Sequence, residues 1–182
     1  MVRWVCLGVG INNFASDRVP MRALIDRLGD LGSATSYGAT GNLVVTSTLS
    51  SGSLAKRLCE RTNRRWAVLG LAQIARIVEE IAKTTRQSHP GVRWTPGVAL
   101  PVKQPEGATL HDVYRAQLWW TSEGRNAVGI LKRDIIDDRG RLDPTQRLGG
   151  WGAVSSEIRR QVKGEWTSRS LRVVEGLLAK VR

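Results

Sequence analysis

The sequence is poor in several residue types, and each scarcity excludes a class of protein. Among 182 residues it has only two cysteines, two histidines and one phenylalanine. Cys6 and Cys59 form no Cys-x-x-Cys pair and are too few for a disulfide framework, so we interpret both as small buried hydrophobic residues. With only His89 and His111 to join them, a zinc site is not expected. The sequence predicts neither a metal nor a cofactor.

Long hydrophobic runs are also missing. No apolar run approaches the roughly 18 to 20 residues that cross a bilayer. The apolar start, MVRWVCLGVGINN, lacks a basic leading region and a convincing cleavage site, and it predicts a first strand instead of a signal peptide. We therefore expect a cytoplasmic protein without a membrane partner.

Acidic residues are scarce relative to basic ones. The chain carries 28 Lys+Arg against 16 Asp+Glu, which gives a net charge of +12. Such a charge attracts anions, whether nucleic acid, a phosphorylated ligand or an acidic partner. Most of the basic residues are arginine, which the codon bias of a GC-rich genome also produces, and both explanations stay open.

Signals for catalysis are weak. His89 lies in a polar segment and His111 opens a short HDVY stretch, so neither predicts a nucleophile–histidine pair. The DIIDD segment holds Asp134, Asp137 and Asp138, but its basic neighbours favour salt bridges at a solvated turn over a metal or acid–base site. No phosphate-binding glycine motif is present. The sequence leaves open whether the protein is an enzyme.

The first half predicts a strand–helix–strand–strand–helix–strand order. Residues 2–9 form a compact apolar strand, Pro20 suits the first position of a helix, and Gly32 suits its end. The TGN turn predicts a hairpin of strands near 34–39 and 42–48. A helix over 54–65 with Ser53 as its cap and a strand over 66–71 complete the order, which is that of ferredoxin-like folds.

The second half predicts a further, smaller α+β unit. A helix over 72–86 ends at QSHPG, the best domain boundary in the chain. Beyond it, VRWTPGVALPV, AQLWWTS and NAVGILKRD predict strands, and two helices are expected at 154–163 and 168–181. The fold class is therefore α+β, with domains at 1–86 and 92–182. We find no internal repeat at a fixed period.

Tryptophan is abundant, with seven residues, and two of them are adjacent. Because neighbours on a strand point to opposite faces, Trp119 and Trp120 cannot share one core. One of them would be covered by the first domain, lie at a dimer contact, or stack on a flat ligand or nucleobase. Core packing remains the alternative for most of the seven.

Basic residues follow one stripe of the helix expected at 54–65. Arg57, Arg61 and Arg64 fall at positions i, i+4 and i+7, and Lys56 and Arg65 lie beside them. Contacts of this kind to phosphates give affinity without sequence specificity. These five residues are the candidate nucleic-acid-binding set, and an ordinary solvated face is the alternative.

The loop after the first strand is a candidate anion site. Gly10 and Asn12 lie where the strand ends and the next helix approaches, and Arg18 follows in the same loop. A helix N-terminus supplies N–H donors and a dipole that favours anions. The alternative is that the asparagines only hydrogen-bond the loop to itself.

Several short motifs resemble the bacterial domain of unknown function 1697 family. They are Gly-Ile-Asn at 10–12, Val-Pro-Met at 19–21, Gly-Asn-Leu-Val-Val at 41–45, and the Thr and Arg of TSRSL at 167–171. Val9, Thr40, Ser170 and Leu171 depart from the family's pattern. The resemblance implies a ferredoxin-like first half with a second α+β unit packed on it, and no activity.

Two functions are therefore expected as alternatives. The first is a non-enzymatic protein that binds an anionic partner, most plausibly nucleic acid. The second is a small-molecule protein, either an enzyme or a sequestering resistance factor, with a planar aromatic ligand in a Trp-lined cleft between the two halves. A homodimer is compatible with both. The candidate ligand-binding residues are Gly10, Asn12, Arg18, Asn42, Trp119, Trp120 and Arg169.

Overall fold

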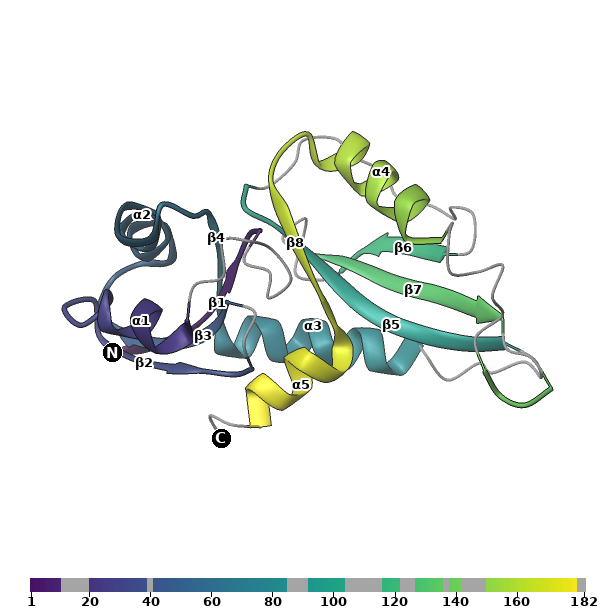
Figure 1. Cartoon of the computed structure of the whole chain (residues 1–182), viewed down its shortest axis with the longest axis horizontal. Helices are drawn as coiled ribbons and strands as arrows, with labels where there is room; N and C mark the ends of the chain where they lie inside the picture. The colour runs from purple at the N-terminus through teal and green to yellow at the C-terminus, as the bar shows by residue number, and fades with distance from the viewer. Residues whose placement is uncertain are drawn as a thin grey trace. The chain divides into compact units, whose positions relative to one another are not determined.

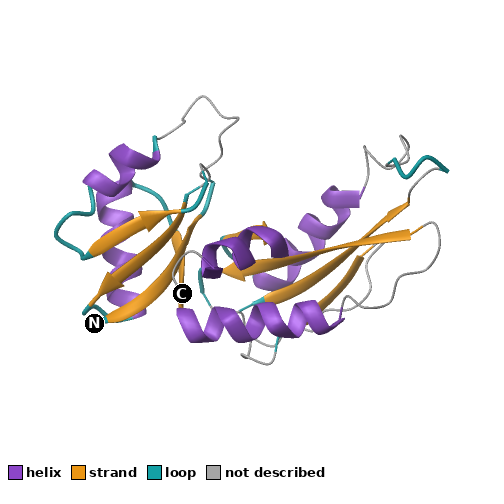
Figure 2. Ribbon diagram, turned by 90° about the horizontal axis from the view of Figure 1, so that it is seen from below, coloured by secondary structure: helices purple, strands orange, loops and turns teal. Residues whose placement is uncertain are grey.

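The computed structural model describes residues 1–10, 20–38, 41–84, 92–103, 116–121, 127–135, 138–141 and 150–179. Within these ranges the chain is α+β, with five helices and two four-stranded antiparallel sheets (Figures 1 and 2). Its contacts group into unit 1, Met1–Ala75 with Val174–Arg182, and unit 2, Arg76–Val173. The QSHPG segment that was expected to separate two domains lies outside the described residues.

Unit 1 contains the predicted order of elements. Its strands are β1 (Val2–Gly8), β2 (Ser33–Ser36), β3 (Asn42–Ser47) and β4 (Trp66–Gly70), and its first helices are α1 (Met21–Asp26) and α2 (Ser51–Thr62). The strands lie in the order β2-β3-β1-β4, and each neighbouring pair is antiparallel.

One hydrophobic cluster joins a face of this sheet to the two helices. Side chains alternate along a strand, so Cys6 of β1 faces the cluster while its neighbours face away. Leu24 of α1 and Leu58 of α2 are fully buried against it. Trp66 is also buried, and its indole N–H donates to Thr62 Oγ1 at 3.0 Å. A buried indole with a satisfied N–H gives the cluster both apolar area and a fixed geometry.

Helix α2 begins and ends earlier than predicted. Its cap is Ser50, whose hydroxyl accepts from the N–H of Ser53, so the prediction of Ser53 as the cap was wrong. The helix ends at Thr62 because Asn63 adopts a left-handed conformation with φ of 52°. Asparagine tolerates this conformation better than most residues, which makes it an effective stop. The predicted extension to residue 65 was therefore wrong.

Unit 2 contains the second sheet. Its strands are β5 (Val92–Pro101), β6 (Ala116–Trp120), β7 (Val128–Ile135) and β8 (Trp166–Ser170), in the order β6-β7-β5-β8. Helix α4 (Gly150–Val162) covers one face through Val154 and Ile158 (Figure 1). With four strands, this sheet has as many as that of unit 1, although the sequence had suggested a smaller unit.

The remaining helices are α3 (Leu71–Thr84) and α5 (Leu171–Ala179). The predicted helix over 168–181 was wrong at its start, because residues 168–170 belong to β8 and pair with β5. The alternation of WTSRS is a strand pattern, but it is only five residues long and runs directly into the apolar stripe of the helix.

The two units repeat one topology. If the strands are numbered within each unit, both sheets have the order 2-3-1-4, and a helix precedes the last strand in both. The strand registers also correspond. Trp4 pairs with Val45 and Gly70 in unit 1, whereas Gly97 pairs with Ile130 and Ser170 in unit 2.

The repeat extends to individual core positions. From α2 onward, equivalent residues differ by 100 in number: Leu54 and Val154, Leu58 and Ile158, Trp66 and Trp166. Even the left-handed residue recurs, as Asn63 (φ 52°) and Lys163 (φ 49°). The strands before α2 correspond at other offsets, for example Cys6 with Ala99 and Leu43 with Val128. Unequal connections between the strands explain why the sequence shows no fixed period.

Candidate functional site

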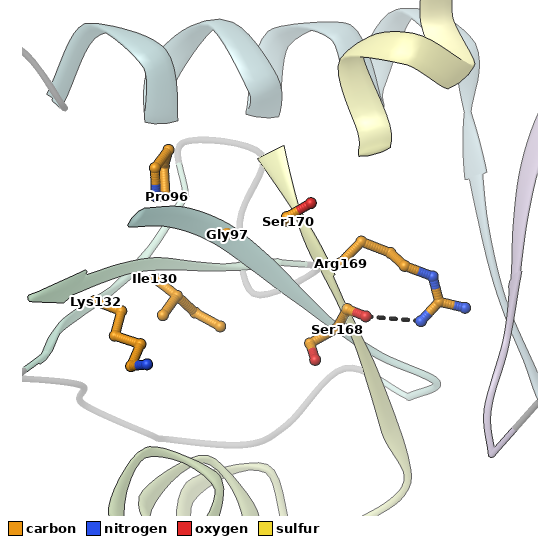
Figure 3. A pocket seen from close by; sticks show the side chains of 7 residues that line it. All are labelled: Pro96, Gly97, Ile130, Lys132, Ser168, Arg169 and Ser170. Carbon is orange, nitrogen blue, oxygen red and sulfur yellow. Dashed lines mark hydrogen bonds between the residues drawn. The ribbon is translucent and has the colours of Figure 1, made fainter. Parts of the chain in front are cut away.

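A pocket of about 280 Å³ lies on the sheet of unit 2 (Figure 3). Three neighbouring strands build it, namely β7, β5 and β8. Its lining residues are Pro96, Gly97, Ile130, Lys132, Ser168, Arg169 and Ser170.

Strand register explains why these residues meet. Gly97 lies on β5, the middle of these three strands, and pairs with Ile130 on β7 and with Ser170 on β8. Lys132 comes two residues after Ile130, and Ser168 comes two residues before Ser170, so the two lie on opposite sides of Gly97 along β5. Figure 3 shows both side chains on the same side of the sheet as Ile130. The pocket thus combines an apolar floor with one ammonium group and hydroxyls, which suits a small ligand with a polar or anionic end.

Arg169 carries a desolvated charge at the edge of this pocket. Its Nη1 donates to Thr167 Oγ1 and to the carbonyl of Ser168, both at 2.7 Å. Burial lowers the pKa of Arg169 to about 10, so the guanidinium still keeps its proton at neutral pH. Its counterpart in unit 1 is the buried Leu69. Figure 3 shows the guanidinium extending away from Lys132.

The adjacent tryptophans of β6 lie on opposite faces, as predicted. Trp120 packs against the hydrophobic cluster that includes Val154 and Ile158 of α4. The ring of Trp119 lies across Gly129, its cross-strand partner, so closely that a Cβ there would meet the indole. The described lining of the pocket includes no tryptophan. This pocket therefore differs from the Trp-lined cleft that the sequence suggested.

The structure gives the other candidate ligand residues different settings. Asn12 and Arg18 lie outside the described residues. Gly10 is exposed, with φ of 69°. Asn42 is buried, and its Nδ2 donates to the carbonyl of Tyr37 at 3.1 Å, which fixes the β2–β3 hairpin. A side chain held this way has a structural role.

The basic residues of α2 are interleaved with carboxylates. Arg57 contacts Glu60 at 3.6 Å, and Arg61 forms an ion pair with Asp30. Lys56 is exposed on the same helix. Since the helix ends at Thr62, the predicted stripe loses Arg64 and Arg65, which lie in the connection to β4. The continuous five-residue basic stripe is not formed as predicted.

Within the described ranges, no group of three or more His, Cys, Asp or Glu side chains could hold a metal ion, and no helix has the length and apolar character that a membrane span needs. His89 and His111 lie outside those ranges. Cys6 is fully buried, and burial raises the pKa of its thiol.

Among the pocket residues, sequence reasoning named only Arg169 as a ligand candidate. Gly97, Lys132 and Ser168 lie on different strands, and strand pairing alone brings them together. One signal was available: WAVLGL at 66–71 and WTSRSL at 166–171 match at Trp and Leu with the same spacing. Aligning them shows that polar residues replace apolar ones on β8.

No known family model matches the chain, and neither does any curated protein. Among solved structures, the chain is similar to a conserved bacterial protein from Streptococcus pneumoniae. The match has a TM-score of 0.67 at 15% identity and covers 100% of this chain and 99% of that one. At this identity the similarity concerns the fold alone.

Proposed function

We propose that this protein binds a small anionic ligand in the pocket of unit 2. One observation carries the proposal: the Lys132 ammonium group and the hydroxyls of Ser168 and Ser170 line a single pocket with an apolar floor. An ammonium group and hydroxyls can all donate hydrogen bonds to a carboxylate or phosphate oxygen.

The charge around the pocket also favours a negatively charged ligand. The chain carries a net charge of +12, which raises the local concentration of anions near its surface. Ser170 also immediately precedes α5, and the first turn of a helix carries partial positive charge. Neither feature would carry the proposal alone, but both attract anions, as the Lys132 ammonium group does.

The test is a titration with inorganic phosphate, followed by amide chemical shifts in NMR spectra. We expect shifts at Gly97 and at 168–170, and an affinity at least about tenfold weaker in Lys132→Ser, the residue at the equivalent position of unit 1. Lys103→Ser removes the same charge from an exposed site and should change nothing. Equal weakening in both variants, or no shifts near Gly97, would refute the proposal.

Nucleic-acid binding stays a second, untested prediction. The net charge supports it, whereas the ion pairs of Arg57 and Arg61 reduce the charge that α2 offers to phosphates. It requires an affinity that falls steeply with salt and falls further in Arg57→Ala/Arg61→Ala. Binding that is insensitive to salt would exclude it.

We also infer that unit 1 is a ferredoxin-like arrangement and that the chain is a distant relative of the domain of unknown function 1697 family. The strand order β2-β3-β1-β4 supports the first inference. The matching motifs at 10–12, 19–21 and 41–45 support the second.

A further inference from the structure

Each residue of the pocket has a counterpart in unit 1, at the position that the strand register assigns to it. By strand register, Gly97 of β5 corresponds to Trp4 of β1, the equivalent strand of unit 1. The flanking residues correspond as Ile130 with Val45, Lys132 with Ser47, Ser168 with Val68, and Ser170 with Gly70.

In unit 1 an indole ring fills this place. Trp4 packs against the hydrophobic cluster, and its Nε1 donates to the carbonyl of Leu49 at 3.1 Å. The ring extends toward β4, because a Cβ placed on Gly70 would lie 3.9 Å from Trp4 Cζ3. In unit 1, this face of the sheet therefore accommodates a flat bicyclic ring on β1.

In unit 2 the ring is absent, and polar side chains join an apolar floor. Gly97 has no side chain, and a Cβ at that position would lie 3.2 Å from the carbonyl oxygen of Arg169, so even a small side chain is crowded. The hydroxyl of Ser168 takes the place of the Val68 side chain, and the Lys132 ammonium takes the place of the Ser47 hydroxyl. The apolar wall at Ile130 is kept.

We propose that the pocket binds a small aromatic carboxylate, with its ring over Gly97 where unit 1 holds Trp4 and its carboxylate at Lys132. This inference rests on the proposed function and specifies its ligand. A volume of about 280 Å³ lies just below the range of about 300–1,000 Å³ that is typical of ligand pockets. It suits one ring or a fused pair of rings and is too small for a dinucleotide.

The experiment compares three probes by calorimetry: indole-3-acetate, neutral indole and acetate. Indole-3-acetate should bind at least about tenfold more tightly than either fragment, because it gains both the ring contacts and the charge contact. Lys132→Ser should remove the preference for indole-3-acetate over indole and leave indole binding unchanged. Lys103→Ser should match the wild type.

A second variant tests the position of the ring. Ser170→Phe places an aromatic side chain where the equivalent residue of unit 1 borders Trp4, and it should abolish indole binding. If Ser170→Phe fails to fold, the smaller Ser170→Leu narrows the pocket at the same place and should still weaken indole binding.

The outcomes separate the two proposals. If acetate and indole-3-acetate bind equally tightly and Lys132→Ser weakens both, the anion site stands and the aromatic ligand is refuted. If indole alone binds as tightly as indole-3-acetate, the carboxylate contact at Lys132 is refuted. If none of the three probes binds, the aromatic carboxylate is refuted, and the phosphate titration decides whether the anion site stands.

Discussion

Unit 1 and unit 2 share one topology, but their side chains differ sharply in size at one position of the sheet. Both bury the same core positions between the sheet and the helix that precedes its last strand, such as Leu58 and Ile158. Yet the central strand of unit 1 presents Trp4 where that of unit 2 presents Gly97. A repeated scaffold can thus keep its core while one copy has, in place of a packed ring, an open pocket with an apolar floor and a few polar side chains.

The largest expected effect comes from converting unit 1 into the form of unit 2. Trp4→Gly removes the indole from its cluster and should cost about 3–5 kcal/mol of the free energy of unfolding, measured in urea. If the variant folds, it should also bind a second equivalent of indole in the calorimeter. A stoichiometry that stays at one would show that the two places are not equivalent.

A smaller effect is expected from converting unit 2 in the opposite direction at Arg169. Its unit 1 counterpart is Leu69, so Arg169→Leu replaces a desolvated charge by hydrocarbon. We expect the free energy of unfolding at neutral pH to rise by about 1 kcal/mol, because a buried charge often costs more than an apolar side chain of similar size.

The pH dependence of this difference follows from the lowered pKa. The folded protein releases the Arg169 proton near pH 10 and the unfolded chain only at a higher pH, so the folded state binds fewer protons above about pH 10. The cost of the charge is complete below about pH 10 and shrinks as the pH rises above that value. A variant less stable than the wild type at neutral pH would contradict this account.

The smallest effect is expected at the paired left-handed residues. Asn63 tolerates positive φ, whereas Lys163 has no such advantage. Lys163→Gly should therefore raise the free energy of unfolding by about 0.5–1 kcal/mol, while Asn63→Gly should leave it nearly unchanged. Equal responses in a thermal melt would show that local strain is not what distinguishes them.

Much of the fold could be predicted because its signals are local. The strand at 2–9, the TGN hairpin and the two-faced helices each follow from a short stretch of sequence. The start of β8 could not be predicted this way, because a five-residue strand beside a strong helical stripe depends on its pairing with β5. The repeat was hidden because its offset changes between the strands and α2.

The candidate site was largely beyond sequence reasoning. Asn42 and Trp119 were named from the sequence as candidate ligand residues. In the structure, Asn42 fixes a hairpin and Trp119 covers Gly129. The pocket depends on an inconspicuous glycine and on a lysine from another strand, and both matter only through the register that aligns them. A missing side chain becomes informative only when a second copy shows what normally fills the space.

The most direct measurement is a crystal structure of the protein soaked with indole-3-acetate. The account predicts a ring over Gly97, between Ile130 and Ser170, with its carboxylate within hydrogen-bonding distance of Lys132 Nζ. A pocket filled by the protein's own side chains, or a ligand bound only elsewhere, would contradict the central claim that unit 2 holds a ligand where unit 1 holds Trp4.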